Sequence, residues 1–359
     1  MTSNGATSTH RRHATIRDVA AAAGVSIGTV SKALNGRGSL RPETRERVIR
    51  AAERLEFRPN DLVRSLIRGR TYTVGLITTD YFGRFNMPVI AGIEDALGAA
   101  EILIFVRNVQ DDPERERRVI GSLLAKQVDG IIVMGRRAEL RPPIDVGRSS
   151  TPVVYAFARV SDPRALCLVP DDEHGGFLAA DHLLQLGRRR LAYVTGPADR
   201  EAVQLRRDGF LRALAAHGVP GEDAPILYGQ WSERWGIEAV GRVLEEAPDV
   251  DGIVCGSDLI ARGVLIGLQE RGRQVPGEIA VVGFDNWQVL AEQARPPLTT
   301  VDMNLHDLGR EAARRLLAKL EGANDGGVIR LPCTLVVRES SGARELSAVP
   351  TGKSYVEAD

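Results

Sequence analysis

TIRDVAAAAGVSIGTVSKALN, residues 15–35, contains two short helical patterns joined by Ala-Gly-Val-Ser. Thr15 is a candidate helix N-cap, and Asp18 three residues later completes a capping box. Gly24 can leave the first helix at positive φ, and Ser26 can cap the second helix. Two helices that meet in so short a turn have the spacing of a DNA-reading helix-turn-helix.

The second helical pattern separates apolar from polar side chains. Val30, Ala33 and Leu34 recur on one side, at the spacing of a buried helix face. The opposite side is small and polar, so it can lie against base edges in a DNA groove. Pro42, at a helix's first turn, then opens a third apolar stripe that we expect to close a three-helix core. This third stripe consists of Val48, Ala51, Ala52 and Leu55.

Charge distinguishes this segment from an ordinary solvated helical bundle, which also shows such stripes. Residues 1–70 contain 14 Lys and Arg against 6 Asp and Glu, whereas the whole chain has 47 of each. The net charge of the whole chain is therefore near zero, although its N-terminal part is basic and the rest of the chain is acidic. A basic module is attracted to the phosphate backbone, and an acidic body is repelled from it. We therefore expect the front of the chain to bind DNA.

The segments TIRDVAAAAGVS, TVSKALN, TRERVIRAAERLEFRPN and SLIRGRT resemble the DNA-binding region of the LacI/GalR (lactose-repressor/galactose-repressor) family of bacterial transcription regulators. Similarity to that family continues to about Glu339. The resemblance implies that residues after the turn enter the major groove, where Lys32 can donate to a guanine edge and Ile27 can contact a thymine methyl. The positions that we expect to contact DNA in this region are Thr15, Ser26, Ile27, Gly28, Thr29, Ser31, Lys32 and Asn35.

Residues 60–70, with the sequence NDLVRSLIRGR, resemble the family's hinge helix. Asn60 is its expected N-cap. A helix this short is marginal alone in water, so we expect it to form when two copies pack together on DNA. The resemblance makes Leu66 the wedge that enters the minor groove and kinks the duplex. The alternative is an ordinary linker that carries a few leucines.

From Thr73 onward the pattern changes to short Val- and Ile-rich runs separated by amphipathic segments, among them VGLIT, GIIVM, LAYVT and IAVVGF. These runs predict buried parallel strands in doubly wound α/β sheets. About 270 residues are too many for one such sheet, so two lobes are expected. The resemblance implies a periplasmic-binding-protein-like core in which the chain crosses between the lobes three times, near 169–172, 297–302 and 329–331.

The predicted division of the chain follows from these patterns. It consists of a disordered arm (1–14), a helix-turn-helix DNA-binding domain (15–59), a hinge helix (60–70), an effector-binding and dimerisation core (71–340) and a flexible tail (341–359). The N-lobe of the core is expected at about 73–170 plus 300–328, and the C-lobe at about 172–297 plus 330–340.

Ligands of open parallel sheets collect beyond the carboxyl ends of the strands, and the loops expected there suit a polyhydroxylated ligand. Charged groups would pair with hydroxyls, and aromatic rings would cover sugar C–H faces. The resemblance places Arg206, Trp231, Ser257 and Asp285 at effector-contacting positions. The full set of expected effector residues is Phe82, Phe85, Phe157, Arg206, Trp231, Ser257 and Asp285.

Other interpretations of these residues remain open from sequence. Arg206 and Asp285 could simply bridge the lobes, and the phenylalanines of the first loop could be core residues. For Asp258 we favour a helix N-cap over a ligand contact.

Three positions depart from the family pattern. Ile67 replaces the usual alanine after the leucine wedge and adds bulk beside it. Arg41 stands where a serine usually caps the third helix, so this cap is either lost or supplied by Ser39. Phe157 stands where relatives carry an acidic residue. A hydrogen bond to the effector is lost there, and a stacking surface can replace it. The resemblance therefore leaves the effector's identity open.

Enzymatic, metal-binding and membrane-bound classes find no support in the sequence. It contains no GxxxxGK[ST] or HExxH pattern, and its GxSxG match, GVSIG at 24–28, lies in the helix-turn-helix and not in a strand-to-helix elbow, so we expect no enzyme and no cofactor. Cys167, Cys255 and Cys333 lie in apolar strand-like runs, which predicts buried thiols and no metal site. Residues 1–13 lack the apolar region of a signal peptide, so the expected location is the cytoplasm.

These patterns together predict a transcriptional repressor that binds a pseudopalindromic double-stranded DNA operator as a homodimer. A small sugar-like effector is expected to control the affinity. The segments MPVIAGIEDALGAA and GVLIGLQE are expected to form the dimer contact. The alternatives are a solute-binding protein with the same two-lobed core, and a regulator that uses a purine-like corepressor.

Overall fold

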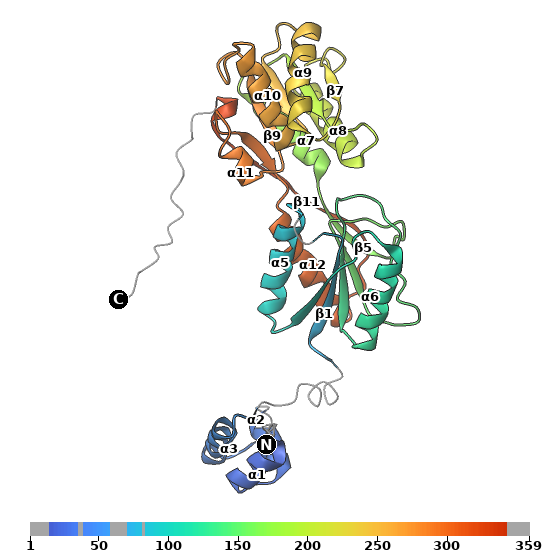
Figure 1. The fold of residues 1–359 in the computed structure, drawn as a ribbon, viewed down its shortest axis with the longest axis vertical. Coiled ribbons are helices and arrows are strands. Elements are labelled where there is room, and N and C mark those ends of the chain that lie inside the picture. The colour runs from blue at the N-terminus through green and yellow to red at the C-terminus, as the bar shows by residue number, and fades with distance from the viewer. Residues whose placement is uncertain (1–13, 35–38, 58–69, 81–82, 343–359) are drawn as a thin grey trace, which may run out of the picture. The chain divides into compact units, whose positions relative to one another are not determined.

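The computed structural model describes residues 14–34, 39–57, 70–80 and 83–342. These residues form two separate compact units, divided between Thr71 and Tyr72 (Figure 1). Residues 1–13, 58–69 and 343–359 lie outside the described residues, and with them most of the predicted arm (1–14), hinge helix (60–70) and tail (341–359). The same holds for four predicted site residues, namely Asn35, Asn60, Leu66 and Phe82.

The first unit begins with the predicted helix-turn-helix. Its helices are α1 (Ile16–Ala23), α2 (Ile27–Leu34) and α3 (Pro42–Arg54). Thr15 donates its backbone N–H to the Asp18 carboxylate at 2.7 Å and accepts the Asp18 N–H at 3.4 Å, which confirms the capping box. Gly24 ends α1 at φ 63°, and Ser26 Oγ accepts the Thr29 N–H at 3.2 Å. The local signals for this turn are therefore confirmed.

The three helices bury one small apolar core. Val19, Val30 and Val48 are fully buried, and each comes from a different helix. Arg41 makes no side-chain cap at the start of α3, so the cap expected in relatives is lost here. Pro42 follows at the first helical position, where its missing N–H leaves one donor fewer to satisfy.

The described residues of the second unit form two six-stranded sheets, each covered by helices, as the sequence predicted. The N-lobe sheet has the order β11-β5-β4-β3-β1-β2 and is wholly parallel. The C-lobe sheet has the order β12-β10-β9-β8-β6-β7, and only β12 is antiparallel to its neighbour. The α/β fold class is therefore confirmed.

The elements of the N-lobe are β1 (Thr73–Thr78), α5 (Asn86–Gly98), β2 (Leu103–Asn108), α6 (Pro113–Ala125), β3 (Gly130–Met134), β4 (Val153–Ala156), β5 (Leu166–Pro170), α12 (Leu305–Leu320) and β11 (Gly327–Leu331). Those of the C-lobe are α7 (Asp172–Gln185), β6 (Leu191–Thr195), α8 (Glu201–Ala216), β7 (Ile226–Tyr228), α9 (Glu233–Glu246), β8 (Gly252–Cys255), α10 (Asp258–Glu270), β9 (Ala280–Phe284), α11 (Gln288–Ala291), β10 (Thr299–Asp302), β12 (Thr334–Val336) and the 3₁₀ turn η1 (Glu339–Ser341).

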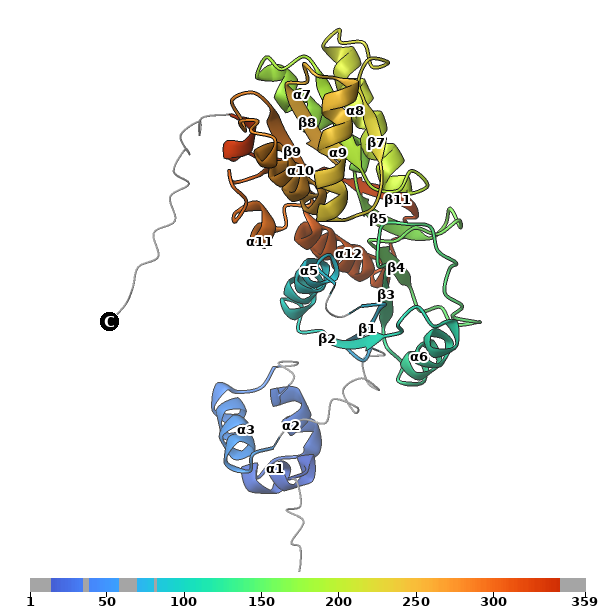
Figure 2. The ribbon, with the colours of Figure 1, turned by 45° about the horizontal axis from the view of Figure 1, so that its top comes forward.

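Two of the expected lobe boundaries need correction. Strand β10 pairs with β9, with Thr300 opposite Gly283, so the C-lobe extends to Asp302 and residues 300–302 do not belong to the N-lobe. Strand β11 pairs with β5 through Leu331, so residues 330–331 belong to the N-lobe rather than the C-lobe. The chain crosses after β5, after β10 and after β11, where Figures 1 and 2 show the connections. Strand pairing decides these boundaries.

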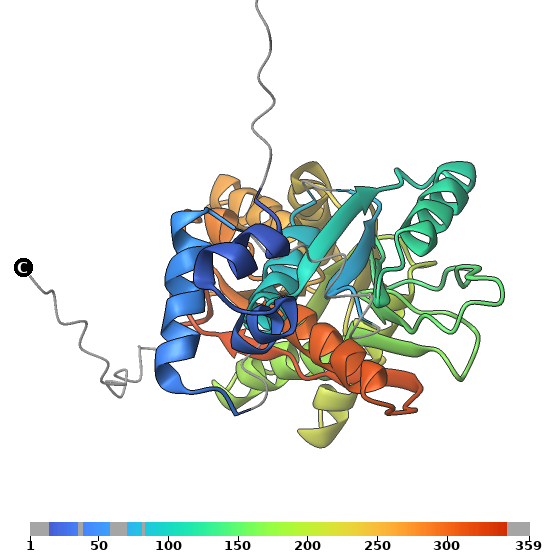
Figure 3. The same cartoon turned by 90° about the horizontal axis from the view of Figure 1, so that it is seen from below.

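Helices cover both faces of each sheet, and the apolar strand residues alternate between them. In the N-lobe, α5 and α12 pack on one face of the sheet and α6 on the other, as Figure 3 shows from below. In the C-lobe, the two helix layers are the pairs α7 with α8 and α9 with α10. The three cysteines are free thiols buried in this framework, as expected. Among the described helices, none is long and apolar enough to cross a membrane.

Glycines face each other in three helix pairs, namely α5 with α12, α7 with α8 and α9 with α10, and allow close packing of the helices. A Cβ on Gly92 of α5 would lie 1.9 Å from the His306 carbonyl oxygen, and one on Gly309 of α12 would lie 2.1 Å from the Val89 carbonyl oxygen. The backbones therefore touch where any side chain would separate them. The equivalent close approaches in the C-lobe involve Gly176 and Gly209 between α7 and α8, and Gly236 and Gly263 between α9 and α10.

Alanine at Gly92 should therefore destabilise the N-lobe by about 3 kcal/mol, because backbone atoms of α12 must move to admit one methyl group. Gly98, on the same helix, is a matched control, since its Cβ would meet nothing within 4 Å. Gly98→Ala should be neutral or stabilising by up to about 1 kcal/mol through helix propensity. Urea unfolding of both variants tests this, and equal midpoints would contradict the close helix contact.

Candidate functional site

A cavity of about 200 Å³ lies between the N-lobe and the C-lobe. Its wall includes residues that follow strands of both parallel sheets, where open α/β sheets hold ligands. Its volume is below the roughly 300–1,000 Å³ of drug-sized sites, so it suits a small ligand. The lining residues are Arg84, Phe85, Arg137, Ala138, Glu139, Phe157, Asp172, Arg200, Ala202, Arg206, Trp231, Ser257, Asp285 and Met303.

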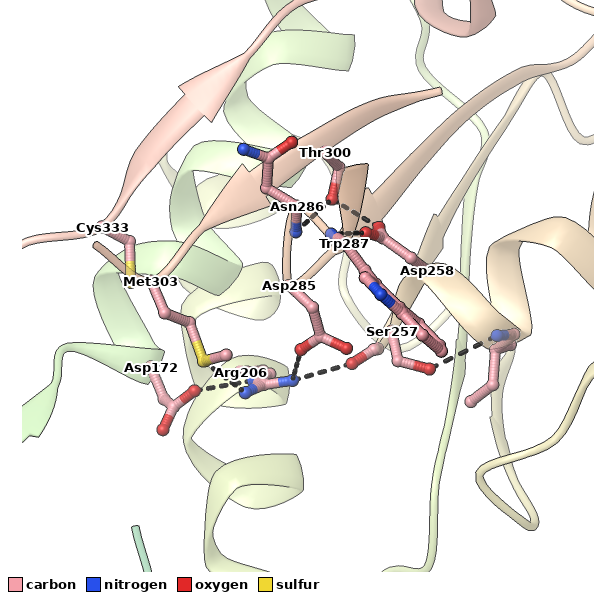
Figure 4. Close-up of polar contacts among 12 residues, drawn as sticks. Asp172, Arg206, Ser257, Asp258, Asp285, Asn286, Trp287, Thr300, Met303 and Cys333 are labelled. Atoms are coloured by element: carbon pink, nitrogen blue, oxygen red, sulfur yellow. Dashed lines mark hydrogen bonds and ion pairs between the residues drawn. The ribbon is translucent and has the colours of Figure 1, made fainter. Parts of the chain in front are cut away.

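Arg206 is the buried cationic centre of the cavity wall. It projects from α8, is 6% exposed, and donates from Nε to Asp172 Oδ1 at 2.7 Å and from Nη1 to the Gly256 carbonyl at 2.8 Å (Figure 4). Its guanidinium carbon lies 3.6 Å from the centre of the Phe284 ring. Burial disfavours the cation, but the surrounding carboxylates more than offset this effect, so the pKa of Arg206 is raised. The guanidinium is thus charged and held rigidly.

Asp285, directly after β9, links Arg206 to the opposite lobe. Its Oδ2 accepts from Arg84 Nη2 at 2.8 Å, and its Oδ1 lies 3.8 Å from Arg206 Nη1. Burial raises the pKa of Asp285 to about 6, although both arginines favour the ionised form. Its φ of 110° is unusual for a residue with a side chain. Such backbone strain, of order 1–3 kcal/mol, is concentrated at functional sites.

Asp258 is not the helix cap that its sequence position suggested. The cap of α10 is Ser257, whose Oγ accepts the Ile260 N–H at 3.3 Å. The Asp258 carboxylate instead accepts the Trp287 N–H at 2.6 Å and the Thr300 hydroxyl at 2.5 Å. It thereby holds the loop after β9 behind the cavity wall. Burial and the nearby Asp285 charge raise the pKa of Asp258 to about 8.

This buried carboxyl should make the C-lobe less stable as pH rises. In the unfolded chain Asp258 titrates near 3.8, whereas in the folded protein it holds its proton to about pH 8. Between these values the folded state binds more protons, so the free energy of unfolding falls with increasing pH. From pH 6.5 to 8.5 the loss from this residue should be about 2 kcal/mol.

Asp258→Asn should remove that pH dependence, because the amide can donate to Thr300 and still accept from Trp287. Asp249→Asn is the control, since the Asp249 side chain is 70% exposed. Urea midpoints measured across this pH range test the expectation. A wild-type slope that Asp258→Asn leaves intact would contradict it.

Aromatic rings line the N-lobe side of the cavity. The Phe85 and Phe157 rings lie 5.8 Å apart, and the Arg84 guanidinium lies 4.3 Å from the Phe85 ring centre. Phe157 is 4% exposed and has φ 53°, a conformation that bulky residues rarely adopt. From the C-lobe, Trp231 lies against Gly196, where a Cβ would approach its ring to 2.3 Å. Flat apolar surfaces therefore face buried charges across the cavity.

Ion pairs join the two lobes around this cavity. Arg84 binds Asp285, Arg159 binds Glu201 at 2.6 Å, and Arg200 lies 3.3 Å from Glu139. In each pair one residue belongs to the N-lobe and the other to the C-lobe. Arg159–Glu201 and Arg200–Glu139 are partly exposed, so each contributes only about 0–1 kcal/mol. In the third pair the Asp285 side chain is 3% exposed, and its lost hydration offsets much of the attraction to Arg84. The lobes are therefore held together by several weak contacts.

The structure brings the described sequence-predicted effector residues to one place. All of them line the cavity, namely Phe85, Phe157, Arg206, Trp231, Ser257 and Asp285. Arg206 does not bridge the lobes, because its partners Asp172 and Asp285 are in the C-lobe, whereas Asp285 does bridge them. Sequence reasoning missed Arg84 and Asp172, although Arg84 lies in the loop after the first strand and Asp172 is the second residue after β5.

The expected DNA-contacting residues of α2 are accessible in the first unit. Ile27 is 45% exposed, and Gly28 and Lys32 are also exposed, whereas Val30 and Ala33 are buried. Other predicted positions have structural tasks as well. These are Thr15 and Ser26 as caps, and Thr29, whose hydroxyl lies 3.0 Å from that of Ser26.

Comparison with known proteins matches both units. Residues 15–60 match the family model described as bacterial regulatory proteins, lacI family, and residues 180–341 match a periplasmic binding protein-like domain. Catabolite control protein A of Priestia megaterium is 34% identical over 330 residues, which cover 91% of this chain and 99% of that protein. The HTH-type transcriptional regulator CelR of Thermobifida fusca is 34% identical over 337 residues, covering 92% and 99%.

Two solved structures show the same architecture over most of the chain. The lac repressor dimer bound to operator and the anti-inducer ONPF has a TM-score of 0.73 at 26% identity and covers 92% of this chain and 100% of that one. The complex of the transcriptional regulator CelR with cellobiose has a TM-score of 0.60 at 32% identity and covers 91% and 99%.

Proposed function

This chain belongs to the lacI family of bacterial regulatory proteins, and we propose from this premise that it represses transcription under the control of a small ligand bound between its lobes. It is a DNA-binding transcriptional regulator, like the relatives that it matches along nearly their whole length. The proposal concerns the finer points, namely the ligand, the assembly and the sign of the response.

The inter-lobe cavity is the observation that carries the ligand proposal. Its rigid, buried Arg206 and Asp285 can each bind hydroxyl groups, and its Phe85, Phe157 and Trp231 rings can cover an apolar ligand face. This combination suits a sugar or sugar derivative. The relative CelR was solved as a complex with cellobiose, which supports the same class of ligand here.

The ligand would act by shifting the balance between lobe arrangements. The inter-lobe ion pairs are individually weak, so a ligand that contacts both lobes can favour one arrangement by a few kcal/mol. The chain between the two units would transmit the change to DNA. In the helix-turn-helix, Lys32 is proposed to read a base edge, and Ile27 and Gly28 to approach the groove. Thr15, Ser26, Thr29 and Ser31 are proposed to help position α2 on the DNA.

A homodimer is proposed from the lac repressor dimer and from the N-lobe surface. Edge strand β2 exposes Leu103 by 67% and Phe105 by 39%, and Met87 of α5 is 55% exposed. Exposed apolar groups of this kind mark interaction surfaces. The other segment that we expected at the interface, residues 263–270, has its Val264, Leu265 and Leu268 buried in its own lobe.

Operator selection tests the DNA part of the proposal. The full chain is incubated with random duplexes at near-physiological salt, and enriched sequences are read. A single motif with two inverted half-sites is expected, together with two chains per duplex by sedimentation. Absence of any enriched motif would contradict sequence-specific regulation and would favour the solute-binding alternative.

A further inference from the structure

The charged groups of the cavity are unevenly satisfied. Its carboxylates, Glu139, Asp172 and Asp285, are all ion-paired with arginines. The hydrogen bonding of the arginines is less complete, because two of them have buried N–H groups without an acceptor. A buried donor without an acceptor costs roughly 1–3 kcal/mol, and more when it is charged. The cavity therefore offers hydrogen-bond donors in excess.

The unused donors belong to Arg84 and Arg200, which both line the cavity. Arg84 Nη2 binds Asp285, while its Nη1 is buried with no partner in the described part of the chain. Arg200 Nη1 reaches Glu139, while its Nε is buried without a hydrogen bond and lies 3.9 Å from the largely exposed Asp199 carboxylate. The Phe85 and Trp287 rings, 4.3 Å and 4.8 Å from the Arg84 guanidinium, hold that group in place and provide no acceptor.

A third arginine adds positive charge without a counter-ion. Arg137 lines the cavity and forms no ion pair within the described residues, whereas its neighbour Arg136 lies 3.8 Å from Asp111 and lines only an adjoining hollow. Four arginines and three carboxylates thus line the cavity, and its remaining wall is largely aromatic and aliphatic. Uncompensated positive charge on the cavity wall favours an anion over a neutral ligand.

We propose that the effector carries an anionic group, a carboxylate or a phosphate, on a small polyhydroxylated body, and that Arg84, Arg137 and Arg200 supply the donors for that group. This inference rests on the proposed function, because it assigns a chemical class to the ligand of the same cavity. The planar guanidinium groups suit the oxygens of either anion. Neutral sugars would leave the buried donors poorly matched.

Matched sugars test the inference on the full-length protein. Binding is measured by calorimetry for D-glucose, D-glucuronate and D-glucose 6-phosphate, and for the corresponding galactose series. At least one acidic member should bind about tenfold or more tightly than its neutral parent, as expected for charge-assisted hydrogen bonds. Glucuronate and galacturonate report on a carboxylate, and the phosphates report on a phosphoryl group.

Arg137→Gln should reduce that acidic preference about tenfold, and Arg136→Gln should leave it unchanged, because only Arg137 faces this cavity. Both arginines are exposed, so neither change threatens folding. A preference that survives Arg137→Gln would overturn the assignment of donors. A neutral sugar that binds as well as its acidic partners would overturn the inference and leave the proposed function standing. Binding by neither set would contradict both.

Discussion

Arg206→Ala should abolish the effect of ligand on operator binding and lower the free energy of unfolding of the C-lobe by about 3–5 kcal/mol. Arg206 is 6% exposed and compensates the buried Asp172 and Asp285 carboxylates. Without the guanidinium, two charges would remain in a water-poor site with one cation fewer. The helix-turn-helix is a separate unit, so non-specific DNA binding should persist.

Arg207 provides the control for this change. It is the next residue along α8, but its pair with Asp208 lies at the surface, with the side chains 35% and 50% exposed. Arg207→Ala should therefore change stability by less than about 1 kcal/mol and leave the ligand response intact. Urea unfolding followed by tryptophan fluorescence reports on the C-lobe, and operator titrations report on the response. A normal ligand response in Arg206→Ala would move the ligand site away from this cavity.

Lys32→Ala should weaken binding to the selected operator by about 1–3 kcal/mol, or roughly 5- to 150-fold. Lys32 is exposed on α2, and an ammonium group can donate to a guanine edge. Binding to unrelated duplexes should fall much less, since loss of one charge removes about one phosphate contact at most.

Arg50→Ala separates base reading from charge. Arg50 lies on α3, with its side chain 72% exposed and 3.7 Å from the Glu46 carboxylate. This variant loses the same charge but should change specific and non-specific binding to a similar small extent. The ratio of the two affinities, measured at one salt concentration, is the decisive quantity. An unchanged ratio in Lys32→Ala would remove Lys32 from base recognition.

The helix-turn-helix could be predicted from sequence because its signals are local. Thr15, Gly24 and Ser26 each act on backbone groups within a few residues, through a cap, a left-handed turn and a second cap. The apolar spacing of Val19, Val30 and Val48 then fixed which helix faces meet. Such short-range rules do not depend on the rest of the fold.

The lobe crossings were less predictable because they depend on pairing between distant strands. Residues 300–302 have an ordinary strand composition, and only their alignment beside β9 assigns them to the C-lobe. In the same way, residues 330–331 belong to the N-lobe because β11 aligns with β5, more than 150 residues earlier in the chain. This alignment cannot be predicted from the composition or the periodicity of either strand.

The site was predictable as a set of loops but not as a network. The rule about strand ends found Arg206 and Asp285. It could not reveal that Arg84 reaches across from the other lobe, because that contact joins residues 201 positions apart. Asp258 shows the opposite error, since its place at a helix start suggested a cap while its carboxylate turned to Trp287 and Thr300.

The central claim is that occupancy of the inter-lobe cavity and operator binding are coupled, and a reciprocal titration tests this claim most directly. Operator affinity is measured with and without the best-binding sugar of the calorimetric series, and the affinity for that sugar is measured with and without operator. Coupling requires both affinities to change by the same factor, expected at about 5- to 150-fold. Weakening would identify an inducer and strengthening a corepressor. Two affinities that do not respond to each other, although both partners bind, would contradict the account.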